Sequence, residues 1–173
     1  LAETLPGADI HAIDVGAPML RYAHARAESM GVAVHYAQQS AEYMSYDDNT
    51  FDFVVSGATL HELSTAGIRN IIRECHRVLK PDGVMIHIEQ PQYKDMDPYD
   101  QFMRDWDTFG NNEPFWGTLH DLDLEAIAVG GGFERGKVLQ SMEWGDEDRG
   151  QVYNVDKPGV ERSPPWFFYT ATK

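Results

Sequence analysis

Two short apolar runs, 51–55 and 84–88, flank a segment whose apolar positions recur three and four residues apart. Neither run alternates between apolar and polar residues, which is typical of strands covered on both faces. The segment between them predicts an amphipathic helix that ends near Leu79, because Pro81 cannot continue a helix and Gly83 permits a turn. Strand, helix and strand in so few residues indicate a right-handed parallel βαβ unit, with the two strands as inner neighbours of one sheet.

The remaining pattern predicts a mostly parallel three-layer α/β fold with an antiparallel pair of strands closing one edge. Turn residues divide the chain into regular segments, and Gly31 marks the end of the first helix. The predicted elements are a strand at 10–13, a helix from Pro18 to Met30, a strand at 32–37, helices at 98–108 and 119–129, and closing strands at 136–144 and 166–172. A long polar loop is expected over 145–165, between the closing strands.

Composition and charge limit the classes of partner and substrate that the protein is expected to bind. The 173 residues suit a single domain over 1–173, and the net charge of −14 disfavours nucleic acid and anionic membranes as partners. A small-molecule substrate is therefore the preferred class. No apolar run reaches membrane-spanning length, and Cys75, the single cysteine, lies on the apolar stripe of its helix, where a buried thiol is expected. A cytoplasmic setting fits these observations.

Ligands of open α/β sheets bind beyond the carboxyl ends of the strands, which selects 56–63 and 89–93 as the functional rim. His61 lies on this rim beside Glu62, and its ordinary pKa suits a general base. The alternative is that His61 packs or caps locally at the start of the following helix. Glu89 is a second rim carboxylate. The other histidines are scattered singly along the chain, a spacing that argues against a metal site.

Three motifs in this order resemble those of class I S-adenosylmethionine (SAM)-dependent methyltransferases. They are Thr50-Phe51-Asp52-Phe53-Val54, then Leu60-His61-Glu62-Leu63, then Arg77-Val78-Leu79-Lys80-Pro81-Asp82-Gly83. Asp82 stands where the family turn has its first glycine. The resemblance covers roughly residues 8 to 135 and implies a Rossmann-like fold, SAM as the cofactor and methyl transfer to a small-molecule acceptor.

The resemblance also implies where SAM binds. An acidic residue ends the family's second strand and accepts hydrogen bonds from the cofactor ribose, and here that residue is Asp14. Ser40 stands in place of the family's usual Asp at the adenine position. The implied cofactor-binding residues are Asp14, Val15, Met19, Ser40, Ala41, Glu42, Ser56, Gly57 and Ala58.

The segment 90–118 is rich in Tyr, Asp, Met and Trp, and in this family such a segment commonly covers the substrate pocket. The alternative is an aromatic stripe that packs on the core. The residues implied to bind substrate are His61, Glu89, Tyr93 and Trp106.

The family's first strand and its glycine-rich loop are expected before residue 1, and no segment of the printed chain replaces them. That strand lies between the strands ending at Asp14 and Ser56 in the family sheet. Because unpaired strand edges recruit partners, we expect these two strands either to close up against each other or to be bridged by a second chain, most simply in a symmetric homodimer. We also expect the 173-residue form to bind SAM weakly or not at all.

Two other functions stay open at this stage. Asp14 alone would suit an NAD-type oxidoreductase, because a strand-end carboxylate binds ribose there too. A methyltransferase-like domain that binds or assembles without catalysis is the other alternative, supported by Ser40 and by the missing glycine-rich loop. Titration with SAM and with NAD separates the three.

Overall fold

The computed structural model describes residues 1–90, 92–93, 96–143 and 166–173. The chain divides into two compact units, residues 1–46 and residues 47–173, and each is described by itself. The predicted loop at 145–165 lies outside the described residues. No helix within the described ranges is long and apolar enough to cross a membrane.

The first unit is a parallel βαβ arrangement made of β1 (His11–Asp14), α1 (Ala17–Met30) and β2 (His35–Gln38). α1 ends at Gly31, whose φ of 66° is the left-handed conformation that glycine adopts at little cost. The Tyr36 hydroxyl donates to a main-chain carbonyl of α1 at 3.0 Å and so ties the helix to β2. The predicted helix and strands are confirmed, although β2 begins three residues later than predicted.

The second unit contains a four-stranded sheet in the order β3-β4-β6-β5. Its strands are β3 (Phe51–Gly57), β4 (Leu79–Glu89), β6 (Trp166–Thr172) and β5 (Val138–Glu143). β3 and β4 pair in parallel, and β6 pairs antiparallel with both β4 and β5. The predicted βαβ unit and the predicted antiparallel closing pair are both confirmed.

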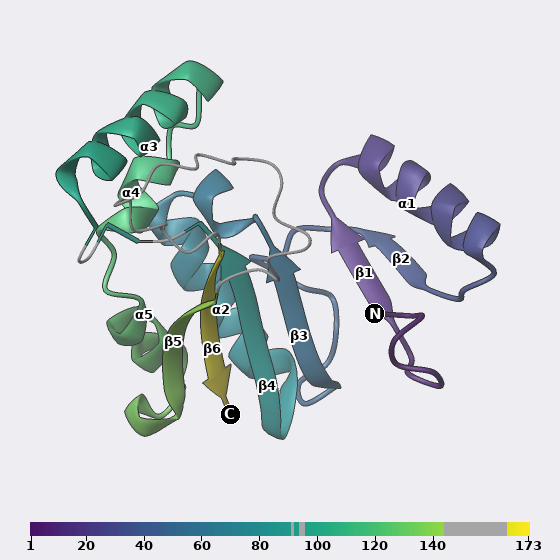
Figure 1. The fold of residues 1–173 in the computed structure, drawn as a ribbon. Coiled ribbons are helices and arrows are strands. Elements are labelled where there is room, and N and C mark those ends of the chain that lie inside the picture. The colour runs from purple at the N-terminus through teal and green to yellow at the C-terminus, as the bar shows by residue number, and fades with distance from the viewer. Residues whose placement is uncertain (91, 94–95, 144–165) are drawn as a thin grey trace. The chain divides into compact units, whose positions relative to one another are not determined.

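One face of this sheet is covered by α2 (Thr65–Val78), which also packs against α5 (Leu124–Gly131) (Figure 1). The Ser64 hydroxyl caps α2 by accepting from the Gly67 amide at 3.2 Å. The predicted apolar stripe of α2 is buried, Cys75 included. The Tyr169 hydroxyl of β6 donates to a main-chain carbonyl of α5 at 2.7 Å and so fixes this helix to the sheet.

The entry into β4 differs from the prediction. Residues 80–83 were expected to form a turn between helix and strand, but α2 leads directly into β4, which begins at Leu79. Asp82 has a φ of 65°, and the β3–β4 register shifts between Phe51 and Phe53. A left-handed residue at this point bends the strand instead of ending it, and the bend takes the place of the predicted turn.

The predicted helix at 119–129 is wrong: the structure has α4 (Trp116–His120) followed by α5. The break arises because the Asp123 carboxylate accepts from the Ala126 amide at 2.9 Å and starts a new helix. α3 (Pro98–Asn111) begins where predicted and runs three residues longer. Two 3-10 turns, η1 (Leu60–Glu62) and η2 (Arg135–Lys137), complete the described elements. α3 and α4 lie beyond the carboxyl ends of β3 and β4 (Figure 1).

β1 and β2 form a sheet of their own, separate from the four-stranded sheet. The expected closure of β1 against β3 concerns both units together and stays a prediction. The alternative expectation, self-association, stays a prediction.

Candidate active site

Three predicted cofactor residues gather at the carboxyl end of β1. The Asp14 carboxylate accepts from the Gly16 amide at 2.6 Å through one oxygen, and its side chain is exposed. Val15 and Met19 are also open to solvent, with 68% and 61% of their surface exposed. Exposed apolar side chains beside a strand-end carboxylate suit a ligand with both a polar and a flat apolar part.

The segment after β2 is folded by its own side chains. The Ser40 hydroxyl accepts from the Glu42 amide at 3.1 Å, which shapes the turn through Ala41 and leaves the hydroxyl proton free to donate. The Gln39 amide N–H donates to the Asp14 carbonyl at 3.1 Å, and the Gln39 side-chain oxygen accepts from the Ser45 amide and hydroxyl. The sequence did not predict that Gln39 would connect the end of β1 to the segment after β2, because this depends on the pairing of the two strands.

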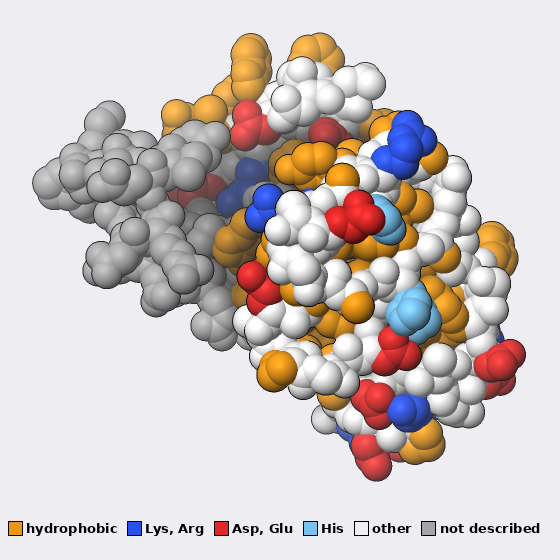
Figure 2. All heavy atoms as spheres, turned by 90° about the vertical axis from the view of Figure 1, so that its right-hand side faces the viewer, with side chains coloured by type: hydrophobic (Ala, Val, Ile, Leu, Met, Phe, Trp, Pro, Cys, Tyr) orange, Lys and Arg blue, Asp and Glu red, His pale blue; other side chains and the backbone are white. Residues whose placement is uncertain are grey.

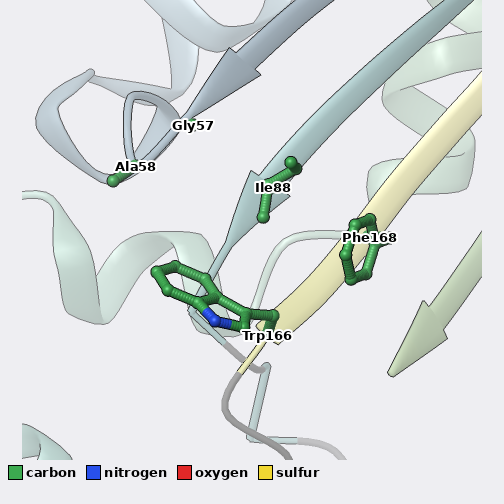
Figure 3. A pocket seen from close by; sticks show the side chains of 5 residues that line it. All are labelled: Gly57, Ala58, Ile88, Trp166 and Phe168. Atoms are coloured by element: carbon green, nitrogen blue, oxygen red, sulfur yellow. The ribbon is translucent and has the colours of Figure 1, made fainter. Parts of the chain in front are cut away.

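In the second unit, the residues after β3 border an open hollow of about 400 Å³. Gly57 and Ala58 form one side of it, and Ile88, Trp166 and Phe168 project from β4 and β6 on the other (Figure 3). The Ala58 amide donates to the Ile88 carbonyl at 2.8 Å, so the loop is fixed to β4. The hollow is predominantly apolar, and it lies at the strand end where a ligand was predicted.

Ser56 lies differently from its neighbours. Its hydroxyl is 2.6 Å from Nδ1 of His87, a residue on the buried face of β4. Burial lowers the pKa of His87 to about 4, so the ring is neutral near neutral pH. Ser56 therefore already has a hydrogen-bond partner within the protein.

Glu89 is the centre of the most buried polar cluster at this strand end. Only 1% of its surface is exposed. One carboxylate oxygen accepts from the amides of Thr59 and Leu60 at 2.7 and 2.5 Å, and the other is 2.8 Å from Nδ1 of His61. Glu89 was predicted to bind substrate, but its side chain is enclosed and its oxygens are engaged by three internal groups. Its oxygens hold the loop and His61, and a contact between Glu89 and substrate stays a prediction.

His61 is 8% exposed, and its ring packs on Trp116 with centroids 5.1 Å apart. The hydrogen bond to Glu89 raises the pKa of His61, and the charges of Glu89, Glu62 and Glu113 act in the same direction against the effect of burial. Because an ionised carboxylate only accepts hydrogen bonds, Nδ1 carries the proton when the ring is neutral. Nε2 then keeps its lone pair, as a base or a metal ligand requires.

The structure connects Tyr93 to this cluster through aromatic rings. Tyr93 stacks on His120 with centroids 4.1 Å apart, and His120 lies 6.3 Å from Trp116, which contacts His61. Burial and a hydrogen bond to Asp105 raise the pKa of the Tyr93 phenol. Trp116 and His120 were missed by sequence reasoning, although their separation of four residues puts them on one face of α4.

Trp106 lies apart from this row of rings. It is exposed on α3, where it approaches Phe102 with centroids 6.3 Å apart. α3 has no buried residue, so the alternative expectation that its aromatic stripe packs on the core is wrong. An open aromatic helix beyond the strand ends agrees with the substrate-cover interpretation without testing it.

Comparison with known proteins shows what the chain is similar to. Residues 1–83 match the family model described as a methyltransferase domain. The chain is 31% identical over 91 residues to the demethylmenaquinone methyltransferase of Thermus thermophilus, which covers 53% of this chain and 40% of that protein. It is 32% identical over 92 residues to the ubiquinone/menaquinone biosynthesis C-methyltransferase UbiE of Pasteurella multocida, covering 49% of this chain and 31% of that protein.

A solved structure of a SAM-dependent methyltransferase from Methanosarcina mazei superposes with a TM-score of 0.64 at 19% identity, over 95% of this chain and 82% of that one. The likeness confirms the predicted Rossmann-like methyltransferase fold. Over residues 1–83 the chain is therefore similar to methyltransferase domains, and its fold is similar to that of a SAM-dependent methyltransferase. The chain spans less than half the length of the two curated relatives above.

Proposed function

We propose that this protein transfers a methyl group from SAM to a small apolar, ring-containing acceptor. The observation that carries the proposal is the buried Glu89, which fixes the loop after β3 and orients His61 at the carboxyl end of two parallel strands. This edge is where α/β folds of this kind place their ligands. A fixed loop and an oriented base are what an alignment-dependent displacement needs.

The residues present fit the cofactor in each unit taken separately. In the first unit, Asp14 is the ribose acceptor, Val15 and Met19 offer apolar contact, and 40–42 form the neighbouring turn. In the second unit, Gly57 faces open space, with no atom within 4 Å of where a side chain would begin. SAM supplies an electrophilic methyl group on its sulfonium. Val15, Ala41, Glu42 and Ala58 stay predicted contacts of the same two segments.

The acceptor class follows from the lining of the hollow and from the relatives. Ile88, Trp166 and Phe168 favour an apolar molecule, and the two curated relatives are named for methylation in quinone biosynthesis. A quinol-type ring must lose a hydroxyl proton as its carbon attacks, so a base is needed. His61 is the proposed base, through Nε2. Tyr93 and Trp106 are proposed acceptor contacts.

Calorimetric titration of SAM and of NAD tests cofactor choice, on the protein as its gene encodes it. SAM is expected to bind and NAD is not. Asp14→Asn should weaken SAM binding by roughly 1.5–3 kcal/mol, about 10- to 150-fold, the range for a hydrogen bond to a charged group. Asp9→Asn, just before the amino end of β1, is the matched control and should leave the affinity for SAM unchanged. Tighter binding of NAD than of SAM overturns the proposal.

Transfer of a labelled methyl group to a demethylated quinol tests catalysis. His61→Gln should lower kcat by about 100-fold or more while SAM affinity is kept, as for loss of a general base. Because the pKa of His61 is raised, wild-type kcat should climb with pH until the ring is neutral, and Glu89→Gln should move that rise to lower pH. SAM binding without methyl transfer to any quinol or phenol would favour the non-catalytic alternative.

A further inference from the structure

A second cluster of chemically active side chains lies in residues 1–46, away from the proposed methyl-transfer residues. It consists of Asp9, His11 and His35, whose ligand atoms all lie within 4.8 Å of one another. Nε2 of His35 is 3.1 Å from one oxygen of Asp9, and Nε2 of His11 is 3.5 Å from the other. Sequence reasoning did not find this group because His35 is 24 residues from His11 along the chain.

The backbone holds the two histidines together. His11 and His35 are partners in the parallel β1–β2 register, and their rings stack with centroids 4.7 Å apart. The His35 amide donates to the Ile10 carbonyl at 2.8 Å, and Tyr46 meets the His11 ring edge-on at 5.5 Å. All three residues of the cluster are exposed. The face drawn in Figure 2 has histidine and acidic side chains next to one another at its surface. The cluster therefore has a fixed strand scaffold and an open side.

The spacing of the donor atoms is compatible with a metal site, since all three lie within 4.8 Å of one another. Ligands about 2.0–2.2 Å from a tetrahedral zinc ion are about 3.3–3.6 Å from one another. The two nitrogen–oxygen distances, 3.1 and 3.5 Å, lie close to that range. Two imidazole nitrogens and one carboxylate favour zinc and its first-row neighbours, whereas magnesium and calcium prefer oxygen ligands alone.

We propose that Asp9, His11 and His35 form a surface site for a divalent transition-metal ion of the zinc type, with water in the remaining coordination position. Asp14 lies at the other end of β1, about 10 Å from His11 at the usual rise per strand residue. The metal site is therefore separate from the proposed cofactor contacts.

Titration of Zn²⁺ into chelator-treated, otherwise intact protein tests the site by calorimetry. His35→Gln and Asp9→Asn should each weaken one Zn²⁺-binding event by at least about tenfold, while Mg²⁺ should not compete. His24→Gln is the matched control, because His24 is also exposed, also in residues 1–46, and also beside a carboxylate, that of Glu28 at 3.6 Å. His24→Gln should leave this binding event unchanged.

A second control tests whether Zn²⁺ binds instead at another group of possible metal ligands, which consists of His61, Glu62 and Glu113. His61→Gln should keep the binding event that His35→Gln weakens. Circular dichroism of every variant confirms that the substituted chain is folded. The proposal is overturned if wild-type protein takes up no Zn²⁺, if His35→Gln and Asp9→Asn bind it as wild type does, or if His24→Gln weakens it equally.

Discussion

Asp14 and Glu89 each end a strand, and the regions around these two carboxylates are built in opposite ways. Asp14, in residues 1–46, is exposed beside exposed apolar side chains, and Ala27 is the one buried apolar residue described in that unit. Glu89, in residues 47–173, is enclosed and engaged by three internal groups. The carboxylate at the strand end is therefore open to solvent in one region and enclosed by the fold in the other.

The difference follows from how much surface each region buries. A unit of 46 residues with so few buried side chains gains little stability from hydrophobic burial. Its strand ends therefore stay exposed to solvent. The larger region has helices on one face of a sheet, and a carboxylate under them must have hydrogen-bond partners or the fold loses stability. Residues proposed for catalysis thus stand on a rigid frame.

The largest expected effect is on Glu89. Glu89→Ala leaves the amides of Thr59 and Leu60 without their acceptor and should lower the free energy of unfolding by about 3–5 kcal/mol, the range for breaking a buried pair. Asp14→Ala should cost about 1 kcal/mol or less, because only its contact with the Gly16 amide is lost. Urea unfolding followed by tryptophan fluorescence measures both. An equal loss of unfolding free energy in Glu89→Ala and Asp14→Ala would contradict the distinction between the two regions.

Acid should act on the larger region through His87. The pKa of His87 is lowered to about 4, against an ordinary value near 6.5. Its contribution to stability is therefore present above about pH 6.5 and is lost as pH falls from there towards 4, with a slope of at most about 1.4 kcal/mol per pH unit. Urea unfolding between pH 4 and 7 should show this slope, and His87→Asn should reduce it. An unchanged slope in that variant would place the titrating group elsewhere.

A smaller effect is expected at the bend of β4. A side-chain carbon at Gly83 would lie 2.8 Å from the Lys80 carbonyl oxygen, so Gly83→Ala should cost about 1–3 kcal/mol. Asp82→Gly is the matched change next to it and should stabilise by about 0.5–1 kcal/mol, because a φ of 65° strains any residue with a side chain. Thermal unfolding of the two variants should therefore shift in opposite directions. A shift in the same direction contradicts the described bend.

The apolar runs and the helical spacing between them were sufficient to predict the βαβ unit at 51–89 and the closing strands. They could not predict the helix break at Asp123 or the bend at Asp82, since each depends on one residue's local hydrogen bonds or backbone angles. The position of Asp14 could be predicted from the strand ending there. The enclosure of Glu89 could not, because its partners come from a loop about 30 residues earlier.

The same limit explains the two clusters missed by the sequence. Trp116 and His120 join the site through ring contacts with residues from other elements. Asp9, His11 and His35 meet only because β1 and β2 pair in one register. Contacts that depend on register or on packing between elements leave no regular spacing in the chain.

Amide hydrogen exchange with and without SAM, on the protein as its gene encodes it, tests the central claim most directly. Without SAM, strands β3, β4 and β6 should exchange far more slowly than β1 and β2, because open regions unfold locally at low free energy. Addition of SAM should slow exchange at 14–19 and at 40–42, and addition of NAD should not. Equal protection of the two regions without ligand, together with no change at 14–19 when SAM is added, would contradict the account.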